Sequence, residues 1–166
     1  MTKQCGAVGI AILLALMGNS VTSAAQRGRR DGPQSNPQLA AVKGLKCSFQ
    51  AAAGATWQDG APQVTTKKTG TLTITISEID TTDGTAQLNG TGGVVFATAK
   101  LAGSNLHFLD MRPGGALTVT TIFAQESHDG RLKAVHTRTD YLAVSFPGFS
   151  SEPEVSQYYG DCEVVQ

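Results

Sequence analysis

The chain has 166 residues, a formal net charge of zero and 16% charged residues, a smaller charged share than most soluble proteins carry. From Val42 to the C-terminus, nine Lys and Arg residues stand against twelve Asp and Glu residues, which gives this part a net charge of −3. That acidic balance argues against an electrostatic nucleic-acid binder, and we expect no nucleic-acid partner.

The first 25 residues have the three parts of an export signal. Lys3 supplies a positive start, residues 6–18 form an uninterrupted apolar run, and polar and small residues follow up to Ala25. We therefore expect a signal peptide over residues 1–25, cleaved after Ala25 or, alternatively, after Ser23. The apolar run is shorter than the ~20 residues that cross a membrane, so we expect no stable membrane span after cleavage. The expected location is periplasmic or secreted, and the alternative is an uncleaved N-terminal anchor.

Residues 26–41 are rich in Gly, Pro and polar side chains and have no apolar periodicity. This composition predicts a disordered linker. Its arginine cluster (Arg27, Arg29 and Arg30) is interpreted as part of a solvated tail, with binding to phosphate or an anionic membrane as the alternative. A single β domain is expected over residues 42–166.

Two strands are predicted in the first part of this domain. A half-buried strand begins at Leu45, where apolar and polar side chains alternate. The clearest strand covers residues 71–79, in which three apolar side chains share one face: Leu72, Ile74 and Ile76. Residues 51–68 lack clear periodicity and are predicted to hold at most a short strand near Trp57.

Turn sequences such as Asp83-Gly84 and Asp129-Gly130 separate six further short strands. These strands are expected near residues 86–88, 94–99, 106–111, 117–123, 132–138 and 157–164. In the fourth of them, four residues share one face: Leu117, Val119, Thr121 and Phe123. About eight short strands joined by tight hairpins predict an all-β antiparallel meander that forms a closed or nearly closed barrel, with a β-sandwich as the alternative.

Two cysteines remain after the predicted cleavage, because Cys5 lies within the signal peptide. Cys47 and Cys162 lie in the first and last predicted strands, which would be neighbours in a barrel. Exported proteins usually pair two such thiols, so we expect a Cys47–Cys162 disulfide. The alternative is a pair of reduced, buried cysteines.

A candidate binding cluster lies on one strand, where His136, Arg138 and Asp140 follow one another at every second position. Such a face could orient a ligand or do acid–base chemistry. The simpler interpretation is a surface ion pair between Arg138 and Asp140. No metal-ligand or nucleophile motif is present, so no metal site, cofactor or committed catalytic residue is expected.

A second candidate lies in the longest connection, where Phe146 and Phe149 flank a Pro-Gly pair. Tyr141 precedes this loop and two further tyrosines follow it. Such a loop could cover a ligand or dock on a protein partner. The competing interpretation is a loop that packs onto the barrel end as a plug.

Parts of the C-terminal half resemble uncharacterised small secreted proteins of proteobacteria. The resemblance lies in residues 106–110, Gly114-Gly115, residues 118–123 and residues 156–162. It implies an exported β domain and no known activity. The overall plan is also similar to calycin-type barrels, which bind small hydrophobic ligands, but the glycine–tryptophan signature of lipocalins is absent near the first strand.

These observations predict an exported, non-catalytic binding or structural β-barrel module, with an unknown small hydrophobic ligand or a protein partner. One alternative is a secreted enzyme that uses His136 with Asp140 or Asp110. Another is a secreted inhibitor that presents the loop of residues 146–149.

Overall fold

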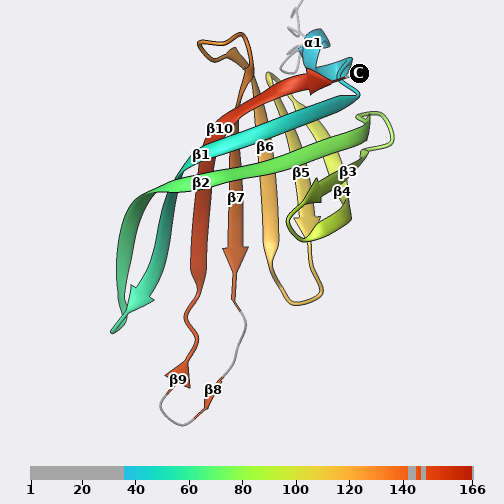
Figure 1. The fold of residues 1–166 in the computed structure, drawn as a ribbon. Helices are drawn as coiled ribbons and strands as arrows, with labels where there is room; N and C mark the ends of the chain where they lie inside the picture. The colour runs from blue at the N-terminus through green and yellow to red at the C-terminus, as the bar shows by residue number, and fades with distance from the viewer. Residues whose placement is uncertain (1–35, 142–144, 147–148, 166) are drawn as a thin grey trace, which may run out of the picture. The chain divides into compact units, whose positions relative to one another are not determined.

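The computed structural model describes residues 36–141, 145–146 and 149–165. Strands dominate this part of the chain (Figure 1). Its elements are α1 (Pro37–Ala40), β1 (Gly44–Gln58), β2 (Ala61–Asp80), β3 (Thr85–Gly90), β4 (Gly93–Ala102), β5 (Asn105–Met111), β6 (Leu117–Glu126), β7 (Leu132–Asp140), β8 (Ser145–Phe146), β9 (Phe149–Ser150) and β10 (Glu154–Val165).

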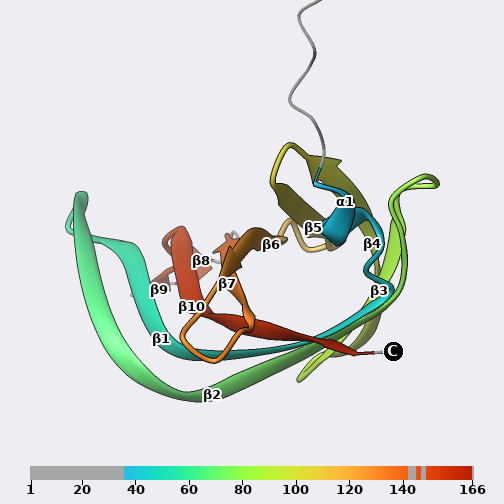
Figure 2. The same ribbon diagram turned by 90° about the horizontal axis from the view of Figure 1, so that it is seen from above.

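Eight of the strands form one closed antiparallel barrel in the order β1-β10-β7-β6-β5-β4-β3-β2. Seen from above, these strands curve round a ring (Figure 2). Strands β8 and β9 form a separate two-stranded hairpin between β7 and β10. The predicted barrel is therefore confirmed. The sandwich alternative is wrong, because β1 and β10 pair directly and close the sheet on itself.

The β1–β2 hairpin is much longer than the sequence predicts. Residues 51–68, predicted to be mostly irregular, continue both strands to a turn at Asp59-Gly60, where both residues have positive φ. Strand β2 pairs with β3 only from Thr75 onward, so the earlier part of the hairpin leaves the barrel (Figure 1). Residues 56–66 are exposed on both faces, which explains why they lack apolar alternation.

The barrel core is built from the predicted alternating strands. Leu45 and Phe49 of β1 are fully buried, as is Ile76 of β2. Phe108 of β5 and Ile122 of β6 complete the same apolar cluster. Burial of these large side chains is the main stabilising term for a domain of this size.

The described part begins at Asn36, inside the segment predicted to be a disordered linker. Asn36 caps α1 by accepting a hydrogen bond from the Gln38 backbone amide at 2.9 Å. Its own amide donates to Gly103 O at 3.0 Å, and Leu39 is fully buried in the core. Leu39 therefore belongs to the barrel core, although it precedes Val42, the predicted start of the domain. Residues 1–35, with the predicted signal peptide, lie outside the described part.

Strand β6 presents its apolar face outward. Leu117, Val119, Thr121 and Phe123 are only partly buried, whereas Thr118, Thr120 and Ile122 are buried inside the barrel. The inner threonines give the barrel interior a polar side.

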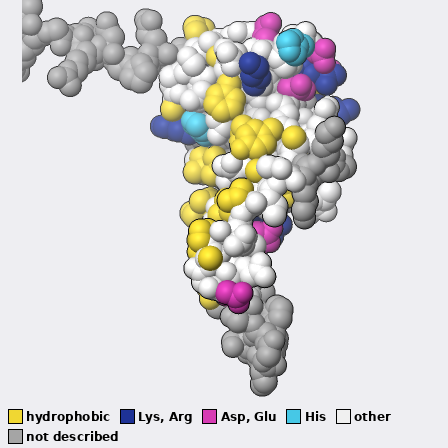
Figure 3. Space-filling model, turned by 90° about the vertical axis from the view of Figure 1, so that its left-hand side faces the viewer, with side chains coloured by type: hydrophobic (Ala, Val, Ile, Leu, Met, Phe, Trp, Pro, Cys, Tyr) yellow, Lys and Arg dark blue, Asp and Glu magenta, His cyan; other side chains and the backbone are white. Residues whose placement is uncertain are grey.

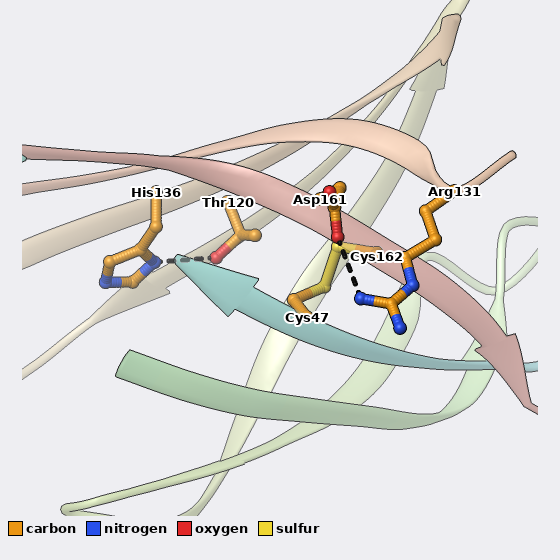
Figure 4. Close-up of a disulfide and its surroundings, with 6 residues drawn as sticks. All are labelled: Cys47, Thr120, Arg131, His136, Asp161 and Cys162. Atoms are coloured by element: carbon orange, nitrogen blue, oxygen red, sulfur yellow. Dashed lines mark hydrogen bonds and ion pairs between the residues drawn. A yellow bond between two sulfur atoms is a disulfide. The ribbon is translucent and has the colours of Figure 1, made fainter. Parts of the chain in front are cut away.

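The predicted disulfide is present between Cys47 and Cys162. The two residues lie directly opposite each other on β1 and β10, with their Cα atoms 3.9 Å apart, and both are fully buried. The bond therefore locks the seam at which the first and last barrel strands meet. Arg131 and Asp161 form an ion pair beside it at 3.4 Å (Figure 4).

Candidate functional site

A pocket of about 220 Å³ is lined by residues of several barrel strands together with the β3–β4 turn. That turn and the end of β5 lie at the barrel end away from α1, the lower end in Figure 1. We call this pocket the mouth pocket. β2 pairs with β3 only from Thr75 onward, and the β2 residues Leu72 and Ile74, which precede that pairing, contribute to the lining. One wall is apolar and consists of Leu72, Ile74, Leu88 and Val95. The opposite wall is polar and consists of Asp110, Arg112, Thr118, His136 and Arg138, while Tyr158, Ala116 and residues 90–93 complete the lining.

His136 lies deepest among the candidate residues and is only 8% exposed. Its Nδ1 atom is 2.8 Å from the Thr120 hydroxyl, which lies directly opposite on β6 (Figure 4). The Tyr158 ring, on the neighbouring strand β10, and the Phe49 ring, on β1 beyond it, each have their centroid 5.9 Å from the imidazole centroid. These contacts hold the ring in one orientation. Among the described residues, no group hydrogen-bonds to its second nitrogen, Nε2.

Burial and, to a smaller extent, the positive charge of Arg138 together lower the pKa of His136 from its ordinary 6.5 to about 4. The imidazole is therefore neutral at physiological pH. A neutral imidazole has one nitrogen that donates and one that accepts a hydrogen bond.

Two ion pairs line the polar wall. Arg112 Nε donates to Asp110 Oδ2 at 3.1 Å, and Arg138 pairs with Asp140 two residues along β7. Asp110 is only 6% exposed, whereas Arg112 and Arg138 reach toward solvent. Thr118 lies between Asp110 and Arg138 in the strand register. The two positive and two negative side chains cancel, so the wall is polar without a net charge.

Arg112 also crosses the pocket rim to the β3–β4 turn. A Cβ atom placed on Gly92 would lie 3.3 Å from Arg112 Nη1, closer than most side chains approach. Because Gly92 has no side chain, the Arg112 guanidinium can lie against the turn without a steric clash. Arg112 lies just after β5, so this contact joins the end of β5 to the β3–β4 turn.

The residues of the first predicted cluster are brought to this pocket. His136 and Arg138 line it, and Asp140 pairs with Arg138, so the expected ion pair is present at its edge. Phe146 and Phe149 lie opposite each other in the β8–β9 hairpin. Their side chains, and residues 147–148, lie outside what the structure describes.

Sequence reasoning missed the partners that complete the site. Thr120 and Tyr158 come from β6 and β10, and only the strand register places them beside His136. The sequence did indicate Asp110. It is a charged residue at the next inward-facing position after Leu106 and Phe108 on the same strand. The other two histidines lie elsewhere: His107 contacts Thr121 at 3.0 Å, and His128 is exposed in a turn.

No group of three or more His, Cys, Asp or Glu side chains in the described ranges is arranged to hold a metal ion. Within those ranges, no helix has the length and apolar character needed to cross a membrane. No protein-family model, curated protein or solved structure matches this chain. The chemistry of its own mouth pocket is therefore the basis for assigning a function.

The lowered pKa of His136 predicts a pH-dependent stability. The unfolded chain takes up a proton near pH 6.5, whereas the folded chain does so only near pH 4. The stabilisation is therefore fully present above pH 6.5 and is lost as the pH falls toward 4. Urea unfolding should show a loss of roughly 2–3 kcal/mol between pH 7 and pH 4.5 from this group. His136→Asn should lose less stability than wild type over this pH range, because it lacks the titrating imidazole. An equal loss of stability in both proteins would contradict the lowered pKa of His136.

Proposed function

We propose that this chain is an exported binding module that holds a small molecule in its mouth pocket. The observation that carries the proposal is the pairing of an apolar wall with a polar wall in one concave site. Ligand pockets commonly combine a mostly apolar lining with a few fixed polar groups. At about 220 Å³ the pocket is smaller than the ~300–1,000 Å³ of drug-sized sites. The ligand is accordingly small or leaves part of itself in solvent.

The architecture supports a module that binds at one end. The core fills the middle of the barrel, and Leu39 of α1 is buried in it from the other end. A ligand in the mouth pocket therefore meets a closed floor. The strands that carry the pocket residues are rigidly paired, which favours a preformed site.

Export is part of the same proposal. The three-part pattern of residues 1–25 supports a signal peptide, and the buried Cys47–Cys162 disulfide fits an oxidising compartment. A periplasmic or secreted location follows.

The enzyme alternative has one favourable observation, because His136 and Asp110 line the same pocket. However, the His136 Nδ1 atom contacts a threonine, and Asp110 pairs with an arginine. A general base normally has its imidazole oriented by a group that stabilises the protonated form. This arrangement instead keeps His136 neutral, so it favours binding over acid–base catalysis.

Exposed apolar side chains outside the barrel must be separated from the pocket in any binding test. Figure 3 shows hydrophobic side chains running down one face of the molecule. Phe96 and Met111 are each 81% exposed. A hydrophobic probe could therefore adhere to the surface without entering the pocket.

Two adjacent valines of β4 provide the matched test. Val95 lines the pocket, whereas Val94 is 58% exposed and points outward. The fluorescent probe N-phenyl-1-naphthylamine should bind the wild-type protein, and Val95→Trp should weaken that binding at least ten-fold by filling the pocket. Val94→Trp should leave it within about two-fold, because its side chain is on the other face. Circular dichroism of both variants checks the fold.

Equal binding by the two tryptophan variants would contradict the proposal. If Val95→Trp fails to fold, Ala116→Leu fills the same pocket from the start of β6 and takes its place. Absence of probe binding to wild type would also count against a small-molecule site.

A further inference from the structure

We infer that the mouth pocket selects an uncharged ligand with an apolar body and one hydrogen-bond acceptor, which receives a hydrogen bond from His136 Nε2. This inference rests on the proposed function and names the ligand chemistry of the same site. It depends on three features of the pocket: the pairing of its charges, its apolar wall and the free nitrogen of His136.

The charged side chains of the pocket are already paired with one another. Asp110 holds Arg112, and Asp140 holds Arg138. Each arginine that an anionic ligand would approach already has an aspartate beside it, and each aspartate that a cationic ligand would approach already has an arginine beside it. The Asp110–Arg112 pair is partly buried, and separating its partners would leave Asp110 buried without a counter-charge, which is costly. The Arg138–Asp140 pair is exposed and contributes less. The polar wall therefore offers no unpaired charge to attract an ionic ligand.

The wall across the pocket increases the cost of a charge. Leu72, Leu88 and Val95 present only hydrocarbon to a bound molecule. An ion placed against such a surface loses hydration and gains no compensating hydrogen bond. An apolar body gains contact there. The two walls together favour a neutral amphiphilic molecule.

The direction of the Thr120–His136 hydrogen bond defines what Nε2 can do. Thr120 is fully buried, and its only side-chain partner among the described residues is His136 Nδ1. A buried hydroxyl hydrogen needs an acceptor, so we assign the Thr120 hydroxyl as the donor and Nδ1 as the acceptor. The neutral ring then carries its proton on Nε2. That N–H lacks a partner in the described structure, and it suits a carbonyl or similar acceptor on the ligand.

Two aromatic rings lie close to the His136 imidazole. Tyr158 of β10 and Phe49 of β1 each have their ring centroid 5.9 Å from the imidazole centroid. A flat ligand body can contact the Tyr158 ring, which lines the pocket, while its acceptor reaches His136. Aromatic ketones are therefore suitable probes of this arrangement.

Three naphthalene derivatives with the same two-ring body test the inference. 2-Acetylnaphthalene is neutral and has an acceptor, 2-ethylnaphthalene is neutral without one, and 2-naphthoate carries a negative charge. Each is used to displace N-phenyl-1-naphthylamine from the disulfide-intact wild-type protein. The acetyl compound should bind about five-fold more tightly than the ethyl compound, as one net hydrogen bond allows. It should bind at least ten-fold more tightly than naphthoate.

Two substitutions assign the hydrogen bond to His136. The amide of His136→Asn can keep the Thr120 contact but does not reach the Nε2 position, so the acetyl-over-ethyl preference should disappear. The longer amide of His136→Gln places an N–H group near Nε2 and should retain the preference. The wild-type series alone remains a valid test if either variant does not fold.

The outcomes separate this inference from the proposed function. Displacement that is equal for all three compounds, or strongest for naphthoate, overturns the inference while pocket binding stands. Preference for the acetyl compound that persists unchanged in His136→Asn also overturns it. Failure of all three compounds to displace the probe, with no effect of Val95→Trp, contradicts the proposed function itself.

Discussion

Gly160→Ala should be among the most destabilising single substitutions in this protein, lowering the free energy of unfolding by roughly 3 kcal/mol or more. Gly160 of β10 lies opposite Phe49, where the pairing of β1 shifts by a bulge. A Cβ atom on Gly160 would lie 1.9 Å from Ser48 O and 2.7 Å from Phe49 Cα. Both are backbone atoms, so no side-chain rotation can relieve the overlap. The barrel seam would have to open.

Gly54→Ala is the matched control, because Gly54 lies in β1 of the same strand pair. A Cβ atom there would have its nearest contact at 3.7 Å, an ordinary van der Waals distance. Its free energy of unfolding should stay within about 1 kcal/mol of wild type. Urea unfolding followed by circular dichroism measures both variants. Similar midpoints for Gly160→Ala and wild type would show that β10 does not approach β1 as described.

Removal of the disulfide should have the largest effect of all. The Cys47–Cys162 bond closes a loop with a sequence separation of 115 residues. The chain-entropy model gives about 4–5 kcal/mol for a loop of this length, as an upper figure. Since a domain of this size is typically stable by about 5–15 kcal/mol, the loss is a large share of the total.

The double variant Cys47→Ala and Cys162→Ala measures this effect against the oxidised wild type in urea. Both cysteines are fully buried, so the alanines also remove some apolar packing, and the loss should not fall below about 2 kcal/mol. Wild type reduced under denaturing conditions and then diluted into urea is the second arm. If the unfolding midpoints of both the double variant and the reduced wild type match that of the oxidised wild type, the disulfide does not stabilise the barrel.

Most of the barrel could be predicted from local pattern. Leu72, Ile74 and Ile76 alternate with threonines. That period of two predicts that they face the core, regardless of which strand pairs with theirs. The Asp-Gly turn at Gly84 requires a positive φ, which glycine tolerates, so the hairpin at this turn could also be predicted from the sequence. Closure followed from counting such strands and from two cysteines at opposite ends of the chain.

The remaining parts of the fold had no such pattern. Residues 56–66 of the β1–β2 hairpin are exposed on both faces, so their strands show no alternation, although the two strands pair along this length. Helix α1 depends on the burial of Leu39, a contact with distant residues. On β6 the sequence favoured an apolar face, yet Thr118 and Thr120 point inward. The barrel can bury these hydroxyls because the histidine on β7 supplies one of them with a hydrogen bond.

Only part of the candidate site could be predicted from the sequence, because the rest also depends on contacts between distant strands. Spacing along one strand brought together His136, Arg138 and Asp140, because residues two apart share a face. Nothing local predicts which residue of β6 or β10 lies across from His136, since that depends on strand register. The pocket itself combines residues from strands far apart in the sequence, such as Leu72 of β2 and Tyr158 of β10, and so depends on long-range pairing.

A methyl and amide NMR titration of the disulfide-intact protein with 2-acetylnaphthalene tests the central claim most directly. Binding in the mouth pocket should shift the methyl signals of Leu72, Leu88 and Val95, together with the imidazole signals of His136. Val94, on the outer face of the same strand, should not respond. Shifts confined to Val94 and other outward-facing apolar side chains, with the pocket methyls unchanged, would contradict the claim.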